Sequence, residues 1–318
     1  MSHIACHPTH RYRRVLTGAP AAIGLALLLA GCQIAGQCAP AASVGAPSGD
    51  TDDKLMRVAD DTRAHGDPAT ALGLYRRLHE TRPSDPEPLA RIAATLAILK
   101  DYGTATEAWR EAIALAPNDP AYRRGLAGAL LSLGQPEPAI AELEIAVAAR
   151  PDDPRLLNTL GVAHDIIGRH DLAQEDYRKG LRLAPHDVGL RNNFGLSLAL
   201  SGDYGGAVAA LEEIVNDPTS PPRYRLNLAL VYGLAGDTEK ASAVARGSLP
   251  EDAVRNNLAY YAMLRGMDDR ARVAAVLGGH SGMAIGRATD APDTAPPLAQ
   301  GEGPGRKVAG EQDRLPAR

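Results

Sequence analysis

A proline recurs every 34 residues through the middle of this 318-residue chain. The members of this column are Pro83, Pro117, Pro151 and Pro185. Self-similarity at a fixed period of this length is typical of repeat architectures, in which each unit buries its apolar face by stacking on its neighbours. The period therefore predicts an array of small, similar units instead of one globular core.

Two columns of small residues accompany the prolines, and a glycine usually lies between them. The first column holds Ala59, Ala93, Ala127, Gly161, Gly195 and Ala229. The second, twelve residues later, holds Ala71, Ala105, Ala139, Ala173, Ala207 and Ala241. The glycines are Gly66, Gly134, Gly168, Gly202 and Gly236, and Lys100 takes that place in the second unit. Small residues let the two helices of a hairpin approach closely. The glycine ends the first helix in a left-handed conformation, and the proline stops the second.

This arrangement resembles the tetratricopeptide repeat, because the signature places of that repeat are filled in the fourth unit. Those places hold Gly161, His164, Gly168, Ala173, Tyr177 and Pro185. The resemblance implies an all-α fold, a right-handed superhelical solenoid of helical hairpins, with six repeats over residues 52–253. Composition agrees, since aromatic residues make up only 4% of the chain and hydrophobic residues 45%, much of it Ala and Leu. Such side chains suit small, closely packed helices better than strands.

Beyond the sixth repeat the period is lost. Residues 254–284 are predicted to form a degenerate capping hairpin whose charged side covers the open end of the array, as a solenoid requires. A seventh, degenerate repeat is an equivalent description. Residues 285–318 are rich in Pro, Gly and Ala and are predicted to be a disordered tail.

Charge and cysteine content exclude several classes of function. The formal net charge is −4, from 34 basic and 38 acidic residues, so no basic field exists to hold nucleic acid. Three cysteines are too few for a disulfide framework or a four-ligand zinc site. The sequence has no Gly-rich phosphate loop and no Gly-x-Ser-x-Gly nucleophile elbow. We therefore expect no enzymatic activity, no metal, no cofactor and no nucleic-acid partner.

The N-terminus has the pattern of an export signal. Three arginines within residues 11–14 precede an uncharged run over residues 15–30, which is shorter than the ~20 residues of a membrane-spanning helix. The run ends in Leu-Ala-Gly before Cys32, which resembles the lipobox of bacterial lipoproteins. The resemblance implies a lipoprotein signal peptide over residues 1–31 and acylation of Cys32. The alternative is an ordinary signal peptide with a chance cysteine.

The region after Cys32 is predicted to be a flexible lipidated tether over residues 32–51, since it is mostly Ala, Gly, Pro and Ser. More than one acyl chain gives stable membrane anchoring. Gln33 follows the cysteine, where an aspartate would resemble an inner-membrane retention signal. The expected location is therefore the outer membrane, with the chain anchored by its acyl chains and facing the periplasm.

The first helix of each hairpin lines the concave groove of a tetratricopeptide array, and a protein partner is expected to bind there. Arginines lie toward its N-terminal end, at Arg57, Arg91 and Arg124. Asparagines lie toward the other end, at Asn158, Asn192, Asn193, Asn227 and Asn257. The apolar floor between them includes Leu196 and Leu230. A row of carboxamides could bond a peptide backbone, or it could tie neighbouring hairpins together, and the sequence favours neither interpretation.

The last repeat and the segment after it carry a second resemblance. Residues 226–237 read Leu-Asn-Leu-Ala-Leu-Val-Tyr-Gly-Leu-Ala-Gly-Asp, and residues 256–261 read Asn-Asn-Leu-Ala-Tyr-Tyr. This resembles the end of the TadD family, the tetratricopeptide lipoproteins of the tight-adherence (Flp pilus) secretion system. The resemblance implies a scaffold for pilus assembly whose partner is an envelope protein, with the secretin as a candidate. The alternatives are a pilotin-like lipoprotein of a type IV pilus or type II secretion system, and a lipid-anchored scaffold for cell-wall or polysaccharide-export enzymes.

Overall fold

The computed structural model describes residues 49–278, and within that range every regular element is a helix. The predicted signal peptide, Cys32, most of the tether and the predicted tail lie outside the described residues. The tether predicted for residues 32–51 overlaps the first helix, because α1 already begins at Gly49. No helix within residues 49–278 combines the length and the apolar character needed to cross a bilayer.

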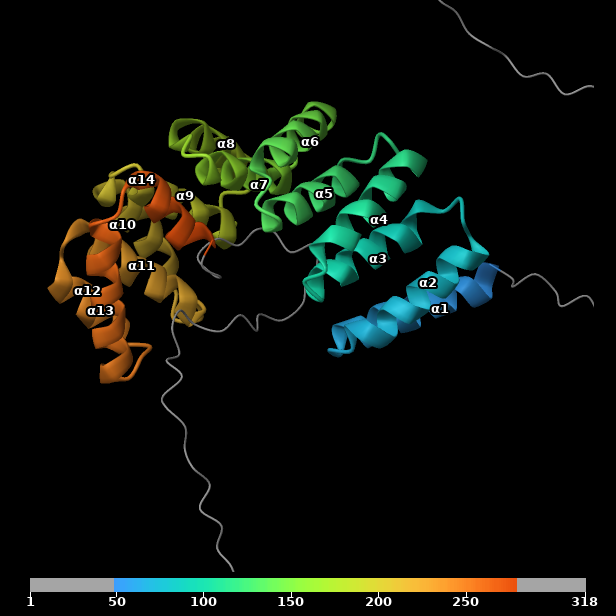
Figure 1. Cartoon of the computed structure of the whole chain (residues 1–318). Helices are drawn as coiled ribbons and strands as arrows, with labels where there is room; N and C mark the ends of the chain where they lie inside the picture. The colour runs from blue at the N-terminus through green and yellow to red at the C-terminus, as the bar shows by residue number, and fades with distance from the viewer. Residues whose placement is uncertain (1–48, 279–318) are drawn as a thin grey trace, which may run out of the picture. The chain divides into compact units, whose positions relative to one another are not determined.

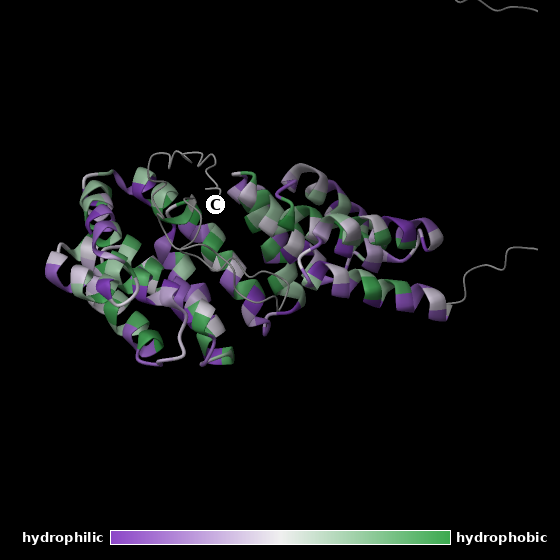
Figure 2. Cartoon of the chain, turned by 90° about the horizontal axis from the view of Figure 1, so that it is seen from below, coloured by the Kyte–Doolittle hydropathy of each residue, from purple (hydrophilic) through white to green (hydrophobic). Residues whose placement is uncertain are grey.

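Twelve of the helices pair into six consecutive hairpins, in agreement with the six predicted repeats (Figure 1). The first helices of the hairpins are α1 (Gly49–Ala64), α3 (Pro86–Ile98), α5 (Pro120–Ser132), α7 (Pro154–Ile166), α9 (Val188–Leu200) and α11 (Pro222–Ala235). The second helices are α2 (Pro68–Thr81), α4 (Tyr102–Leu115), α6 (Pro136–Ala149), α8 (His170–Leu183), α10 (Tyr204–Val215) and α12 (Thr238–Arg246). Figure 2 shows apolar and polar residues mixed along these helices.

Aspartates two residues after the column prolines start the first helices. Asp85 follows Pro83 and accepts a hydrogen bond of 3.0 Å from the backbone N–H of Glu87, where α3 begins. The same relation recurs at Asp119, Asp153 and Asp187. A side-chain cap of this kind stabilises a helix by about 1 kcal/mol. The proline column therefore marks where one hairpin ends and the next begins.

A left-handed residue follows the first helix of every hairpin, as the glycine column predicts. The five glycines have φ between 71° and 90°. Lys100 adopts the same conformation with φ 62°, although a side chain makes this region unfavourable. The predicted role of this column is confirmed, and Lys100 is its one strained member among the described residues.

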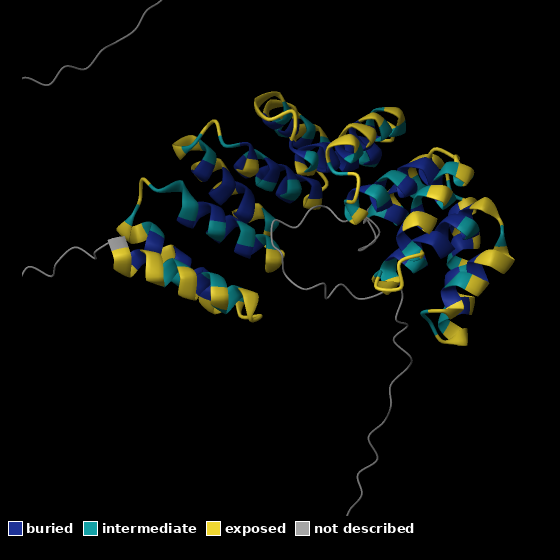
Figure 3. Cartoon of the chain, turned by 180° about the vertical axis from the view of Figure 1, so that it is seen from behind, coloured by how far each residue is buried: buried dark blue, intermediate teal, exposed yellow. Residues whose placement is uncertain are grey.

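The small-residue columns lie where the two helices of a hairpin are closest. Every alanine in them is fully buried. At Gly161 a Cβ atom would lie 2.6 Å from the ring of Tyr177, so the ring uses the space that the glycine leaves. Buried residues face the neighbouring helices and exposed residues lie on the outer sides (Figure 3).

Neighbouring hairpins approach each other more closely through their odd-numbered helices. Contacts that skip one helix join α3 to α5, α5 to α7, α7 to α9 and α9 to α11. No pair of consecutive even-numbered helices within residues 49–278 is joined to a comparable extent. The odd-numbered helices therefore form the inner, concave side of the array, in agreement with the expectation for this repeat.

The C-terminal region departs from the repeat pattern. α13 (Glu251–Arg265) packs against α11 and α12, as the first helix of another unit would. The predicted second helix is split into α14 (Asp269–Val273) and the π-helix η1 (Ala274–Gly278). α14 contacts α9, whereas the second helix of a capping hairpin would pack along α13.

Candidate binding groove

The concave face is open at one end of the array and closed at the other. The residue five places after the first small residue of a unit shows the difference. Ile98 on α3 is 48% exposed, whereas Leu200 on α9 and Leu234 on α11 are 5% and 3% exposed. Leu196 and Leu230, the apolar residues expected to meet a partner, are also buried. The accessible part of the groove therefore lies toward the N-terminal end of the array, on α1 and α3.

The three groove arginines have different environments. Arg57 is exposed on α1. Arg91 on α3 is half-buried, and its guanidinium lies 3.4 Å from Asp60 Oδ1 and 3.0 Å from Glu87 Oε1. Arg124 on α5 is buried, and this burial lowers the pKa of its guanidinium. Arg57 therefore has the greatest freedom to contact a partner.

Four of the five asparagines form a ladder of hydrogen bonds across three hairpins. Asn193 Nδ2 on α9 donates to Asn158 Oδ1 on α7, at 3.0 Å. Asn192 Nδ2 donates to Asn193 Oδ1 at 3.3 Å, and Asn227 Nδ2 on α11 donates to Asn192 Oδ1 at 2.8 Å. All four side chains are buried. The ladder joins α7, α9 and α11, which is the structural role that the sequence left open.

A partner could reach the asparagine ladder only after neighbouring side chains move, so backbone binding by these residues stays a prediction. Asn257 on α13 is buried as well but does not extend the ladder. Its Nδ2 atom has no hydrogen-bond acceptor among the described residues. The hydroxyl of Tyr261, one turn later on the same helix, also has no hydrogen-bond partner among them. The sequence-predicted groove residues are thus divided between an open N-terminal part and a buried C-terminal part.

A buried carboxylate that sequence analysis missed joins three helices. Asp165 on α7 accepts hydrogen bonds from His170 Nδ1 at 2.6 Å, Ser197 Oγ at 2.7 Å and the Tyr177 hydroxyl at 3.0 Å. Burial raises the pKa of this carboxyl, and the hydrogen bond from His170 is the largest effect that opposes the rise. In a nucleophilic triad the serine would bond to the histidine. Here both donate to the same carboxylate oxygen, so the cluster fits a joint between hairpins.

Exposed apolar residues recur at the turn after the first helices, which sequence analysis also missed. Leu99 and Leu133 are each 42% exposed, and Ile167 is 36% exposed. They are spaced by 34 residues, so they occupy the same place in three successive hairpins. We call Leu99, Leu133 and Ile167 the apolar row. A search for apolar residues at the repeat period outside the hairpin interface would have found it.

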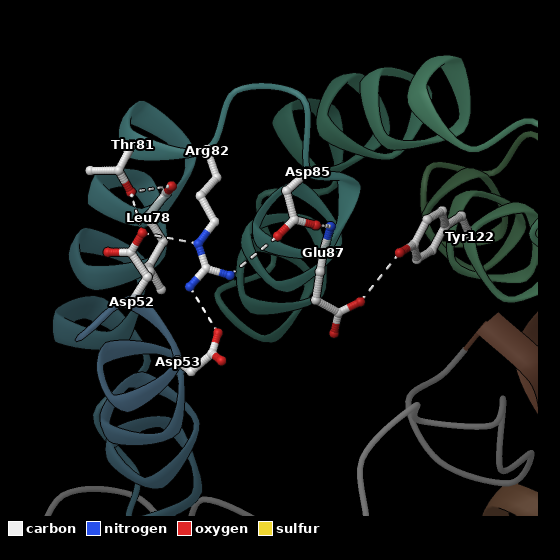
Figure 4. Close-up of polar contacts among 8 residues, drawn as sticks. All are labelled: Asp52, Asp53, Leu78, Thr81, Arg82, Asp85, Glu87 and Tyr122. Carbon is white, nitrogen blue, oxygen red and sulfur yellow. Dashed lines mark hydrogen bonds and ion pairs between the residues drawn. The ribbon is translucent and has the colours of Figure 1, made fainter. Parts of the chain in front are cut away.

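Ion pairs order the N-terminal end of the array (Figure 4). The Arg82 guanidinium at the end of α2 lies 3.0 Å from Asp52 and 2.9 Å from Asp53, both on α1. It also lies 3.6 Å from Asp85, the N-cap of α3. One side chain therefore joins the first hairpin to the second and fixes the helices that carry the open groove.

Chemical sites are sparse in the described part of the chain. No group of three or more His, Cys, Asp or Glu residues within residues 49–278 is arranged to hold a metal ion. A shallow depression of about 330 Å³ lies between α8, α9 and α10. The Arg178 guanidinium lies over the Phe194 ring there, 5.3 Å from its centre. Neither the depression nor the contact between Arg178 and Phe194 provides a nucleophile with a base beside it.

Comparison with known proteins identifies the repeat. Two models of the tetratricopeptide repeat match the sequence, over residues 96–161 and 158–221. No curated protein sequence matches the chain.

Among solved structures, PilW, described as a widely conserved type IV pilus biogenesis factor, is 16% identical with a TM-score of 0.60, over 67% of this chain and 100% of its own. PilF of Pseudomonas aeruginosa is 18% identical with a TM-score of 0.53, over 71% of this chain and 97% of its own. Cut9–Hcn1 of the APC/C is 20% identical with a TM-score of 0.58, over 70% of this chain and 42% of its own. At these identities the likeness shows the fold alone. The described part of the chain is therefore an all-α solenoid of helical hairpins, in which tandem tetratricopeptide repeats are matched over residues 96–221.

Proposed function

We propose that this chain is a lipid-anchored, non-enzymatic scaffold of the outer membrane that helps assemble the tight-adherence (Flp) pilus. Stacked tetratricopeptide hairpins provide extended surfaces that bind proteins. The anchor rests on the lipobox that ends at Cys32, and the pilus assignment rests on the resemblance of residues 226–261 to the TadD family. The likeness in fold to a type IV pilus biogenesis factor supports a role in pilus assembly.

The observation that carries the binding function is the apolar row at the hairpin turns. The apolar row is exposed in three successive hairpins, and Ile98 adjoins it at the end of α3. Apolar residues repeated at the period of the array favour a partner that lies along several hairpins. Arg57 is an exposed positive charge on the first hairpin, where an acidic side chain of the partner could pair with it. The secretin is the proposed partner.

A matched pair of double variants tests this surface. Leu99→Asp/Leu133→Asp places two charges in the apolar row, and we expect loss of secretin co-purification and of surface Flp pili. Leu115→Asp/Leu183→Asp is the control, because these leucines are 43% and 47% exposed at the ends of second helices. The control should keep both properties, and both variants should keep the wild-type melting temperature. Full piliation and binding in the first variant would contradict the proposed surface.

The anchor is tested by a pair of cysteine variants. Cys32→Ser removes the thiol to be acylated, so incorporation of a labelled fatty acid and recovery in the outer-membrane fraction should both be lost. Cys38→Ser leaves the lipobox intact and should behave as the wild type. Normal acyl labelling of Cys32→Ser would refute the lipoprotein assignment.

A second candidate is a pilotin-like lipoprotein of a type IV pilus. The likeness in fold to PilW over 67% of this chain favours it. A deletion strain distinguishes the two candidates, since the first requires loss of Flp pili and the second loss of type IV pili or of the type IV secretin. Full piliation of the deletion strain, together with co-purification of the wild-type protein with cell-wall or polysaccharide-export enzymes, would contradict both.

A further inference from the structure

The last described segment of the chain packs back against an earlier hairpin instead of continuing the stack of hairpins. After α13, residues 268–278 form α14 and η1, and α14 contacts α9 in the fifth hairpin. Figure 1 shows this orange-to-red segment beside α9. It therefore lies against a first helix, on the side of the array where the groove is closed.

Two valines of this segment enter the apolar core of the array. Val273 and Val276 are three residues apart and are 4% and 6% exposed. They belong to the same apolar cluster as Leu196, Leu200 and Leu230, which come from α9 and α11. The segment thus presents a short apolar side to a cluster that α9 and α11 also line, and α14 contacts α9 directly.

Equivalent positions on the first helices of other hairpins show how exposed an apolar side chain is where residues 268–278 do not cover it. Ile98 on α3 occupies the place of Leu200 on α9 and Leu234 on α11, yet it is exposed and they are buried. The difference follows the C-terminal segment, because α14 contacts α9, α13 contacts α11, and neither has a comparable contact with α3. The apolar surface of α9 and α11 is therefore covered by the C-terminal segment of the same chain.

The contacts that hold η1 are few and local. The Tyr260 hydroxyl on α13 donates a 3.2 Å hydrogen bond to the Ala275 carbonyl. The Arg272 guanidinium on α14 donates to the carbonyl of Leu264, in the last turn of α13, and to that of Met267, in the connection after it. A π-helix is rare and often marks a functional site. These contacts fit a segment that can leave the surface while α13 stays in place.

We propose that the concave surface of α9 and α11 is a docking site for a short helical segment of a partner protein. That segment carries two apolar side chains three residues apart, as Val273 and Val276 do. Residues 268–278 occupy the site as an internal ligand, which the partner displaces when it binds. The proposal rests on the proposed function only for the identity of the partner.

A peptide with the sequence of residues 268–278 is the probe, and the full chain is the receptor. Val273→Asp/Val276→Asp releases the internal ligand, because a buried carboxylate without a partner is disfavoured. Fluorescence polarisation should show that this variant binds the labelled peptide at least about tenfold more tightly than the wild type, whose site is occupied. A peptide with aspartates at the two valine positions should not bind. The control chain Val58→Asp/Val188→Asp, changed at exposed valines, should bind as weakly as the wild type.

The proposal is overturned if the variant has the wild-type melting curve and binds the peptide no better than the wild type. Where the aspartate variant loses its helical circular dichroism, Val273→Ala/Val276→Ala takes its place, with the same expected gain and the same overturning result. Peptide binding needs no pilus component. A failure here therefore leaves the piliation results unaffected, and loss of the pilus assignment leaves the peptide result standing.

Discussion

Replacement of Asn193 by alanine should destabilise the array by about 2 kcal/mol. The side chain is fully buried, donates to Asn158 at 3.0 Å and accepts from Asn192 at 3.3 Å. Two such hydrogen bonds contribute about 1–3 kcal/mol together. The higher helix propensity of alanine offsets less than about 1 kcal/mol of the loss. In an array of this size, a loss of about 2 kcal/mol lowers the melting temperature by roughly 4–8 °C.

Circular dichroism at increasing urea concentration and temperature measures this change. Asn118→Ala is the matched control, because Asn118 lies exposed in the turn between α4 and α5. It should shift the free energy of unfolding by less than about 0.5 kcal/mol, as surface substitutions usually do. Unfolding in distinct stages would assign the loss to the hairpins that contain α7 and α9, since repeats contact only their neighbours.

A double-mutant cycle on Asn192 and Asn227 tests the ladder itself, since these side chains are joined at 2.8 Å across α9 and α11. A coupling energy of about 0.5 kcal/mol or more is expected for residues in one hydrogen-bond network. Two results together would refute the interpretation of the ladder as a structural tie. The effects of the Asn192 and Asn227 substitutions would be additive, and the Asn193→Ala variant would be as stable as Asn118→Ala.

Four further substitutions examine glycine packing, backbone strain and capping. Gly161→Ala should destabilise by about 1–3 kcal/mol, because its Cβ would lie 2.6 Å from the Tyr177 ring, whereas Gly128→Ala meets open space in α5 and should stabilise by about 0.5–1 kcal/mol. Thermal melts of the two variants should shift in opposite directions, and equal shifts would contradict the packing. Lys100→Gly should raise the urea midpoint by relieving the φ of 62°, and a lower midpoint would argue against strain there. A backbone hydrogen bond at the start of α12 lowers the pKa of Asp237 below 3.8, so its stabilising effect is present at neutral pH and is lost as the pH falls through the lowered value. The free energy of unfolding in urea should therefore decrease more for the wild type than for Asp237→Asn as the pH falls from 5 to 2. Parallel decreases in the two proteins would be evidence against this linkage.

Local signals explain why the hairpins could be predicted so completely. Each depends on residues close in sequence, namely the proline column, the aspartate caps and the left-handed residue such as Gly168. A 34-residue period also makes every interface between neighbours similar, so one unit indicates the next. Within the described residues 254–278 the prediction of a capping hairpin was less accurate, because the period ends there and no local signal indicates which surface a short helix will cover.

The candidate site was predictable in position and not in accessibility. Sequence analysis predicted that Leu196 and Asn193 lie on the concave side of α9, which is one of the odd-numbered helices that contact one another between hairpins. Whether such a residue is open to a partner depends on what lies above it. The burial of these residues depends on Val273 and Val276, which are distant in the sequence, and on side chains of adjacent hairpins.

The sequence by itself determined the unit of this protein, its number of copies and the helix face that each copy buries. Those properties follow from short-range steric and hydrogen-bonding preferences that repeat along the chain. Only the tertiary structure decided that the asparagines bond to one another and that residues 268–278 close one end of the groove. A carboxamide can form hydrogen bonds with solvent, with a partner or with its own chain, and a valine can pack against a partner or against its own chain. The choice depends on distances between atoms that the fold alone brings together.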